Sequence, residues 1–360
     1  MKNATCPKCF ADLPENAWVW RCESDGCSNE GFRINMGLAK KNAAGRPICP
    51  ACQSPVSAPF CPECSQRLSG EDEDATLFVS LVGGEGSGKS HFLSVLIDRL
   101  KRQVGKAFGC TLYPMGGDDT LAIYENQYYK PLFERGRCIA TTRQEGVSPL
   151  IYSMVFDTGR SAKTAGLTFY DACGSNFHSV SAMAGRNRSI YHSAGILFFV
   201  DPAQLPAIRA MRPESGQRRS EADPVSLLAR TVHLIREGSA QRNLRQKIDI
   251  PLAVCLTKLD SVRSLLDISS YLGRESPHIA KGTFDRLESA ASGLEVQSLI
   301  DYWGGGELLE QVSAQFSNHA WFALSALGAE PDENGAVQKI APLRVADPLL
   351  WLLWQKKLIK

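Results

Sequence analysis

The sequence lacks any apolar run long enough to cross a membrane. Its longest uninterrupted apolar stretches, 196–200 and 349–354, fall far short of the roughly 18 residues that a membrane-spanning helix needs. The first residues, Met1–Cys6, also lack the apolar core of a secretory signal. An excess of charge of one sign is missing as well, because 40 basic and 38 acidic residues leave a net charge of +2. This balance gives no electrostatic case for bulk nucleic-acid binding. We therefore expect a cytoplasmic protein without stable membrane insertion.

Histidine is also missing from the N-terminal part, since none precedes His91, whereas cysteine is concentrated there. Of the twelve cysteines, eight lie in the first 64 residues, mostly as Cys-x-x-Cys pairs. In a chain without export signals thiols stay reduced, so clustered pairs indicate metal ligands rather than disulfides. Sets of four thiolates are typical of structural zinc sites. The candidate zinc ligands are Cys6, Cys9, Cys22, Cys27, Cys49, Cys52, Cys61 and Cys64.

The order of these pairs predicts two four-thiolate sites in residues 1–68. We expect sequential pairing because each loop is then short, and an interleaved pairing is the alternative. One site would be Cys6, Cys9, Cys22 and Cys27, and the other Cys49, Cys52, Cys61 and Cys64. This arrangement resembles tandem zinc ribbons, whose stability would depend on the metal. No basic stripe stands out, so we expect the ribbons to contact a protein or brace a neighbouring domain, and nucleic acid is the less favoured ligand.

A phosphate-binding loop follows the cysteine-rich segment. The acidic stretch 69–76 is typical of a solvated linker, and 77–82 is an apolar run that fits a buried parallel strand. Residues 83–90 then match the pattern G-x4-G-K-[ST] in full. Glycines let backbone N–H groups approach a polyphosphate, Lys89 reaches its β- and γ-phosphates, and the Ser90 hydroxyl ligates Mg²⁺. The candidate nucleotide-binding residues here are Gly83, Gly84, Glu85, Gly86, Ser87, Gly88, Lys89, Ser90 and His91.

Two further segments fit a nucleotide-sensing switch. A predicted strand over 167–171 ends in the pattern D-x-x-G, in which Asp171 would hold Mg²⁺ through water and the Gly174 N–H would sense a γ-phosphate. Upstream, a loop ends in Ala-Thr-Thr-Arg at 140–143, the natural place for a threonine that ligates Mg²⁺. Thr142 is the first choice and Thr141 the second. Threonines that merely end a loop are the alternative interpretation.

The base is indicated by two motifs that also follow predicted strands. Thr257-Lys-Leu-Asp260 fits [NT]-K-x-D, in which Asp260 would accept hydrogen bonds from guanine N1–H and the 2-amino group. Adenine lacks these donors and would leave the carboxylate unpaired, which is unfavourable. A later strand over 322–324 ends in Ser-Ala-Leu, which would bring the Ala326 N–H to the guanine oxygen. The candidate base-binding residues are Thr257, Lys258, Asp260, Ser325, Ala326 and Leu327.

The strand spacing predicts the fold class. Predicted strands over 150–156 and 167–171 are joined by residues 157–166, which are too few for a crossover helix, so this pair should be an antiparallel hairpin. We predict a three-layer α/β domain over 77–360 with a mixed, mostly parallel sheet, preceded by the small zinc module. The apolar stretch 349–354 is predicted to pack on that sheet as part of the last helix.

Together the five motifs of the α/β domain resemble the five G motifs of the TRAFAC-class P-loop GTPases. The resemblance extends from residue 77 to the end of the chain. The Ala-Thr-Thr-Arg switch, the long segments between motifs and the stretch Asp347–Leu353 look more specifically like the double-GTPase (DO-GTPase) branch. That resemblance implies a role in a bacterial antiphage or conflict system. The resemblance also implies that the chain works there with other proteins of the same system, of which a second GTPase is one candidate partner.

One position departs from the family pattern. Many GTPases place a glutamine after the D-x-x-G glycine to orient the attacking water, and the resemblance implies a glutamate in this branch. The chain has Ser175 there, and His178 is the candidate replacement, with a surface histidine as the alternative. We therefore expect Mg²⁺-dependent GTP binding with slow hydrolysis. The candidate catalytic residues are Lys89, Thr142, Asp171, Gly174 and His178.

Two other functions fit the same motifs. A nucleotide-locked scaffold would bind GTP or GDP without turnover and leave the work to the ribbons. A nucleic-acid sensor would read its ligand through the ribbons and report through the GTPase domain.

Overall fold

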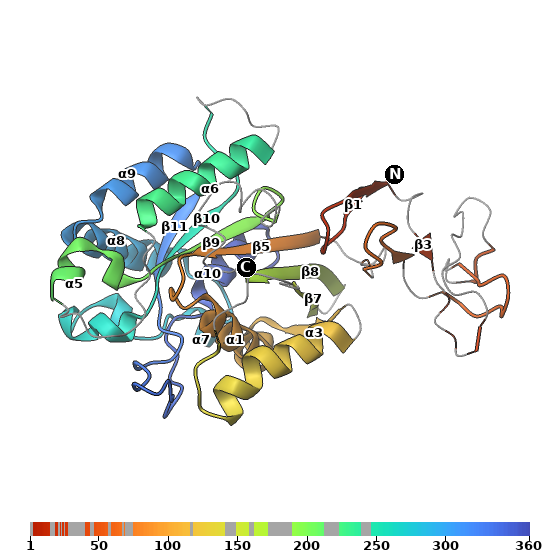
Figure 1. Cartoon of the computed structure of the whole chain (residues 1–360), viewed down its shortest axis with the longest axis horizontal. Helices are drawn as coiled ribbons and strands as arrows, with labels where there is room; N and C mark the ends of the chain where they lie inside the picture. Colours follow the sequence, from red (N-terminus) through yellow and green to blue (C-terminus); the bar gives the residue numbers. More distant parts are fainter. Residues whose placement is uncertain are drawn as a thin grey trace.

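The computed structural model describes residues 3–14, 19–20, 22, 24, 26–27, 40–43, 47–56, 59–66, 68, 75–115, 118–140, 149–157, 162–171, 189–211, 223–238 and 246–360. Its centre is a seven-stranded sheet of order β11-β10-β9-β5-β8-β7-β6 (Figure 1). β7 pairs antiparallel with both of its neighbours, β6 and β8, and every other pair of neighbouring strands is parallel. The predicted mixed, mostly parallel sheet is therefore confirmed. The strands are β5 (Ala75–Gly83), β6 (Cys110–Pro114), β7 (Leu150–Asp157), β8 (Ala162–Asp171), β9 (Gly195–Val200), β10 (Leu252–Leu256) and β11 (His319–Ala323).

The central strands are apolar on both faces because both faces are covered. Along β9, Leu197 and Phe199 face one core, whereas Phe198 and Val200 face a second core on the other side of the sheet. Alternation of this kind follows from the two-residue period of a strand. Continuous apolar runs are thus the expected sequence of strands in the middle of a three-layer domain.

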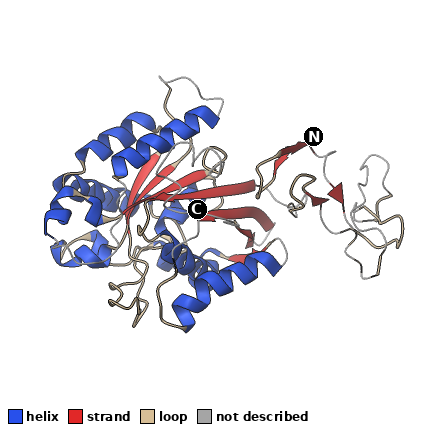
Figure 2. Ribbon diagram, viewed as in Figure 1, coloured by secondary structure: helices blue, strands red, loops and turns tan. Residues whose placement is uncertain are grey.

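Helices form a layer on each face of the sheet (Figure 2). One layer contains α1 (Lys89–Arg99) with its π-helical continuation η2 (Leu100–Val104) and α2 (Gly105–Phe108), α3 (Asp118–Ile123) with its π-helical continuation η3 (Tyr124–Glu134), α7 (His278–Lys281) and α10 (Asp347–Gln355). The other contains α5 (Pro206–Met211), α6 (Pro224–Gly238), α8 (Arg286–Tyr302) and α9 (Gly306–Gln315). Short 3-10 turns are η5 (Pro202–Gln204), η6 (Leu259–Leu265) and η7 (Tyr271–Gly273). In α10, residues 349–353 are buried against the sheet, as predicted. Within the part of the chain given above, no helix is both long and apolar enough to cross a membrane.

The predicted hairpin is present, but its second strand is longer than expected. Asp157 pairs with Ala162, so β8 begins earlier than residue 167 and the connection is shorter than the predicted loop 157–166. Lys163 and Thr164 extend the ladder opposite Phe156 and Val155. Polar residues are tolerated there because the Lys163 side chain is exposed and that of Thr164 is half-buried.

The cysteine-rich segment has its own small strands and core. β1 (Asn3–Thr5) and β2 (Asp12–Pro14) form a hairpin, and β3 (Val19–Trp20) pairs with β4 (Pro59–Phe60). Three cysteines and four apolar residues form the buried hydrophobic cluster of this segment, and four more cysteines pack against it. The members of the cluster are Cys6, Leu13, Trp20, Cys49, Val56, Cys61 and Leu68. In Figure 1 the segment is red to orange and extends to the right of the sheet.

Candidate functional site: a phosphate loop and two cysteine tetrads

The register of the sheet brings the sequence motifs to one edge. Leu81 of β5 lies opposite Asp171 of β8, and Gly83 lies opposite Phe199 of β9. Leu256, the last residue of β10, lies opposite Val200 on one side and Ala323 on the other. The segments that follow these strands therefore leave the sheet at the same edge, which is where open α/β sheets bind ligands.

The loop between β5 and α1 has the conformation of a phosphate cradle. Gly86 and Gly88 adopt left-handed φ values of 75° and 89°, which other residues rarely adopt. Lys89 is buried, and its Nζ donates to the Gly83 and Gly84 carbonyl oxygens at 2.8 and 2.9 Å. The Ser87 hydroxyl closes the loop by donating to Gly84 O at 2.8 Å. The side chain of Lys89 thus folds back against the loop, and its ammonium lies between the first two glycine carbonyls and the Ser87 hydroxyl.

Close packing explains the first glycine of the loop. A Cβ atom on Gly83 would lie 2.9 Å from the Phe199 Cβ and 2.6 Å from the Ser87 Oγ. Such distances require the neighbours to move, so alanine at Gly83 would push the loop away from β9. Close packing therefore accounts for a glycine at this first position of the motif.

Two of the three predicted magnesium residues, Ser90 and Asp171, lie in contact, and the third, Thr142, lies outside the described residues. Asp171 is the last residue of β8 and is 2% exposed. Its Oδ2 accepts a hydrogen bond from the Ser90 Oγ at 2.6 Å. The same oxygen accepts a second hydrogen bond from the Tyr128 hydroxyl at 3.1 Å, a partner that no sequence motif indicates. A serine hydroxyl beside a carboxylate is an oxygen-rich ligand set that suits Mg²⁺.

The two base motifs also meet. The Ser325 hydroxyl donates to Asp260 Oδ1 in a short contact, and Leu259 N donates to Leu324 O at 3.1 Å. Ser325 is in turn held by paired backbone hydrogen bonds with Leu343. Ala326 and Leu327 follow and are partly buried against the core. The carboxylate of Asp260 is therefore fixed in orientation by the second motif.

Lys258 has a partner that the sequence did not reveal. Its backbone is left-handed, with a φ of 49°, and its Nζ lies 2.6 Å from Asp201 Oδ2. Asp201 follows β9 and is 3% exposed. The sequence pattern that could have indicated Asp201 is the Asp-Pro pair directly after an apolar strand. Asp201 also begins the turn that follows, because its carboxylate accepts a hydrogen bond from Ala203 N at 2.9 Å. Asp201 thus restrains the side chain of Lys258, one of the candidate base-binding residues.

His91 belongs to the candidate set, and its ring is used within the protein. The His91 Nε2 accepts a hydrogen bond from Ile139 N at 3.1 Å. Burial, with a contribution from the charge of Lys258, lowers the pKa of His91 to about 4, so the ring is neutral at physiological pH. Since the ring bonds within the protein, we expect only the backbone N–H of His91 to contact a phosphate, and this contact stays a prediction. The ring ties the first turn of α1 to the segment that leads to the predicted switch threonines.

Several predicted residues lie outside the described residues. They are Thr141, Thr142, Gly174, Ser175 and His178. Their roles at the switch stay predictions.

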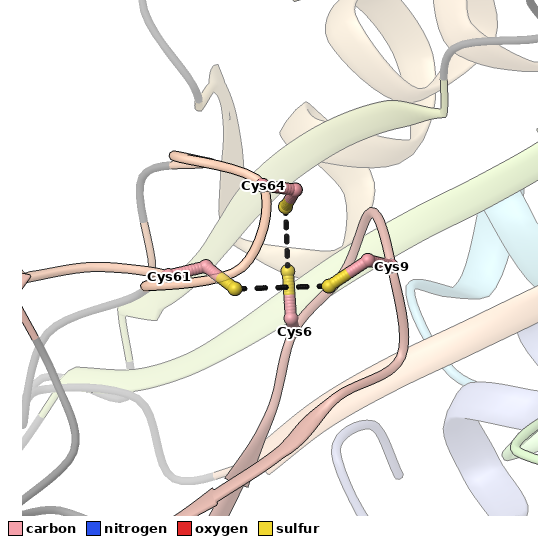
Figure 3. A group of neighbouring side chains, drawn as sticks. All are labelled: Cys6, Cys9, Cys61 and Cys64. Carbon is pink, nitrogen blue, oxygen red and sulfur yellow. Dashed lines mark hydrogen bonds between the residues drawn. The ribbon is translucent and has the colours of Figure 1, made fainter.

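The eight N-terminal cysteines form two groups, as predicted, but the pairing is not sequential. One tetrad consists of Cys6, Cys9, Cys61 and Cys64, and the other of Cys22, Cys27, Cys49 and Cys52. Figure 3 shows the four sulfur atoms of the first tetrad pointing toward one another. In each tetrad the ligand atoms lie within 4.8 Å of one another. Four sulfurs around a tetrahedral zinc at about 2.3 Å would be about 3.8 Å apart. The Cys6–Cys64 and Cys22–Cys52 sulfur distances of 3.5 and 3.4 Å are close to that spacing.

The ladder between β3 and β4 explains why sequential pairing is wrong. Trp20 pairs with Pro59 and Val19 with Phe60 in antiparallel register. The chain between these strands therefore leaves one end of the ladder, whereas the chain before β3 and after β4 lies at the other end. The two inner cysteine pairs must meet at the first end and the two outer pairs at the second. The tetrads are consequently nested, which is neither the sequential nor the interleaved arrangement.

Three of the cysteine pairs share one turn. In each, the residue after the second cysteine has a left-handed φ near 60° and its N–H donates to the first cysteine's carbonyl at 2.9–3.0 Å. These residues are Phe10, Gln53 and Ser65. The first turn also contacts the sheet, because the Phe10 ring lies 5.0 Å from the ring of Tyr170 and 6.0 Å from that of Phe78. The Tyr170 hydroxyl donates to Pro7 O.

Comparison with known proteins gives weak similarity. No protein-family profile matches the sequence, and no curated protein does. Among solved structures, one similar structure is the Arl6 BBS3 small GTPase from Trypanosoma brucei with bound GppNp, which is 11% identical, with 79% of this chain and 99% of that chain covered and a TM-score of 0.33. Another is the S. cerevisiae Ski7 GTPase-like domain bound to GTP, which is 15% identical, with 80% of this chain and 51% of that chain covered and a TM-score of 0.37. A third is Methanosarcina barkeri Roco2 RocCORdC bound to GDP, which is 12% identical, with 81% of this chain and 52% of that chain covered and a TM-score of 0.29. The chain spans about half the length of the second and third of these chains. Because these TM-scores and identities are low, we base no argument about function on the similarity to these structures and use the sequence motifs and the geometry of the site instead.

Proposed function

We propose that the protein is a Mg²⁺-dependent GTP-binding and GTP-hydrolysing switch. The observation that carries this proposal is the meeting of two residue pairs at one edge of the sheet. Ser90 donates to Asp171 beside the phosphate loop, and Ser325 donates to Asp260 beside Lys258. The first pair suits a metal–phosphate group and the second a guanine base, and the register places both after neighbouring strands.

The residues divide the work in the proposed reaction. Backbone N–H groups of the loop and the Lys89 ammonium would bind the phosphates and offset the charge that develops on transfer. Ser90 and Asp171 would hold Mg²⁺, which would neutralise charge on the β- and γ-phosphate oxygens. Asp260 would select guanine. A partner or self-association would supply the arginine or order the water-positioning residue, so hydrolysis by the isolated protein would be slow.

Asp260→Asn provides the test of the base. The asparagine amide oxygen can still accept from N1–H, but its NH2 group then opposes the guanine 2-amino group, since both are donors. Xanthine keeps N1–H and offers a carbonyl at the 2-position, so GTP affinity should fall and xanthine nucleotide should bind better. We expect a loss of GTP affinity on the order of 10²-fold or more, because a buried polar mismatch is left unpaired. Competition of GTP, ATP and XTP against a fluorescent guanine nucleotide measures this change.

Asp249→Asn is the matched control for that experiment. Asp249 accepts a hydrogen bond from the Ser317 hydroxyl at 3.0 Å, much as Asp260 does from Ser325, but it precedes β10 and Ser317 precedes β11. It therefore lies at the opposite edge of the same strands, and its variant should bind GTP like the wild type. Equal displacement by ATP and GTP in the wild type would contradict a guanine-specific site.

The zinc module would hold two structural zinc ions, and we propose that the first tetrad braces the α/β domain. Support comes from Phe10 and Pro7, which belong to the turn between Cys6 and Ala11 and contact Phe78 and Tyr170 of the sheet. We propose that the second tetrad, whose Cys52 is exposed, is the part available to another protein. From the resemblance to the double-GTPase branch, we propose cytoplasmic proteins of an antiphage system as the partners.

Loss of one tetrad or the other should therefore have different effects on stability. Cys61→Ser breaks the bracing tetrad, so we expect the thermal midpoint of the α/β domain to fall by several degrees, as a loss of about 1–2 kcal/mol would produce in a domain of this size. Cys52→Ser breaks the other tetrad and should leave that midpoint within about one degree. Calorimetry of the two full-length variants makes the comparison. A fall of equal size in both would show that the first tetrad has no special role in bracing.

A further inference from the structure

One buried tyrosine lies in direct contact with the proposed magnesium site and belongs to none of the motifs. Tyr128 is 6% exposed and comes from η3, far from the phosphate loop in sequence. Its hydroxyl donates to Asp171 Oδ2 at 3.1 Å, the oxygen that also accepts from Ser90. Asp171 thus has two hydroxyl donors on one carboxylate oxygen, and the second comes from a helix that packs against α1.

The helix that carries Tyr128 is fastened to α1 by two reciprocal hydrogen bonds. The Ser94 hydroxyl donates to the Tyr128 carbonyl at 3.1 Å, and the Tyr124 hydroxyl donates to the Ser94 carbonyl at 3.1 Å. Ser94 is fully buried and lies one turn after Ser90. The backbone of Tyr128 is therefore held against the same helix that carries the serine of the phosphate loop.

The helix that carries Tyr128 departs from regular α-helical geometry. Residues Tyr124–Glu134 form a π-helix, a wider and rarer form than the α-helix that occurs often at functional sites. Pro131 lies within it, where it lacks the N–H that a regular helix would use. The chain then continues to Ile139, whose N–H is bound by His91, and on to the predicted switch threonines. The helix that carries Tyr128 thus contacts the magnesium carboxylate and directly precedes the predicted switch segment in sequence.

We propose that Tyr128 is a positioning residue for Mg²⁺: its hydroxyl, together with Ser90, fixes the Asp171 carboxylate in the orientation that binds the metal's water. This inference rests on the proposed function. Hydrogen bonds to the charged form of a carboxylate favour that form. Two donors on one oxygen also restrict rotation of the carboxylate, so less ordering is required when the metal binds.

The test compares Tyr128→Phe with Tyr124→Phe in the full-length protein. Both changes remove one hydroxyl from a buried tyrosine of the same helix, but Tyr124 bonds to Ser94 O and has no hydrogen bond with Asp171. The measurement is retention of a fluorescent GDP analogue as free Mg²⁺ is varied. Loss of a hydrogen bond to a charged group should raise the Mg²⁺ concentration for half-maximal retention about 10-fold in Tyr128→Phe. Tyr124→Phe should shift it far less, because the Ser94 hydroxyl still holds the Tyr128 carbonyl and the Tyr128 hydroxyl still reaches Asp171. GDP binding in excess chelator should be equal in all three proteins.

The possible results separate this inference from the function on which it rests. If the wild type retains no GDP at any Mg²⁺ concentration, the proposed function is wrong and the inference falls with it. Two results would overturn the inference alone. Either Tyr128→Phe needs the same Mg²⁺ concentration for half-maximal GDP retention as the wild type, or Tyr124→Phe raises that concentration as much as Tyr128→Phe does. In both cases the role of Tyr128 is structural only. Should Tyr128→Phe unfold, Tyr128→Met fills the space with a flexible apolar chain and lacks the hydroxyl, so the same 10-fold shift is expected.

Discussion

Lys89→Ala should reduce GTP hydrolysis by on the order of 10³-fold, which would bring it close to the uncatalysed background. Catalysis of phosphoryl transfer depends almost entirely on positioning and on charge stabilisation, and removal of one such contact costs about 10²–10³ in rate. Lys89 is the only cationic side chain of the loop 83–90. Its ammonium is held against that loop by the Gly83 and Gly84 carbonyls. Phosphate release under single-turnover conditions, with partners added in a second series, measures the effect.

Lys106→Ala is the control for a general effect of removing a lysine. Lys106 is exposed on α2, in the same helical layer, and makes no contact with the phosphate loop. It should leave hydrolysis unchanged. If the wild type binds GTP and releases no phosphate with or without partners, the protein is the nucleotide-locked scaffold instead. Fast turnover by dilute wild type that drops sharply in Ser175→Ala would show that Ser175 itself is catalytic.

The motifs were predictable from sequence because each consists of adjacent residues after a strand. Strand 77–82, the loop that follows it and Asp171 are fixed by local patterns, and parallel pairing then brings them to one edge. The Ser90–Asp171 contact follows from that rule alone. Tyr128 does not, because its contact with Asp171 depends on how η3 packs on α1, and its own neighbourhood reads as an ordinary amphipathic helix. The same holds for Asp201, whose pairing with Lys258 is a contact between two different strand ends.

The error in cysteine pairing has a different physical cause. Loop closure favours short loops only weakly, since the entropic penalty grows as the logarithm of loop length. Doubling a loop costs about 0.6 kcal/mol, which a few hydrogen bonds and one buried tryptophan can offset. Here the β3–β4 ladder and the burial of Trp20 favour the nested arrangement. A ladder of two-residue strands has no recognisable sequence pattern, so the order of the cysteines alone pointed to the wrong partners.

Two double variants distinguish the nested from the sequential pairing by zinc content. Cys6→Ser with Cys64→Ser removes two ligands from one tetrad of the structure and leaves the other tetrad intact. We therefore expect zinc to fall from about two equivalents per chain to about one, because a tetrahedral site that loses two of four thiolates no longer holds its metal tightly. Sequential pairing would place those cysteines in different sites and would predict loss of both ions.

Cys6→Ser with Cys22→Ser gives the opposite pattern. These cysteines belong to different tetrads of the structure, so each site loses one ligand and both ions should be weakened or lost. Sequential pairing would place both in one site and leave one zinc ion. Elemental analysis of reduced protein after brief exposure to a competing chelator measures the zinc that remains, since a site of three thiolates exchanges its metal more readily than a closed site of four. One equivalent in this variant and none in the first would overturn the nested tetrads.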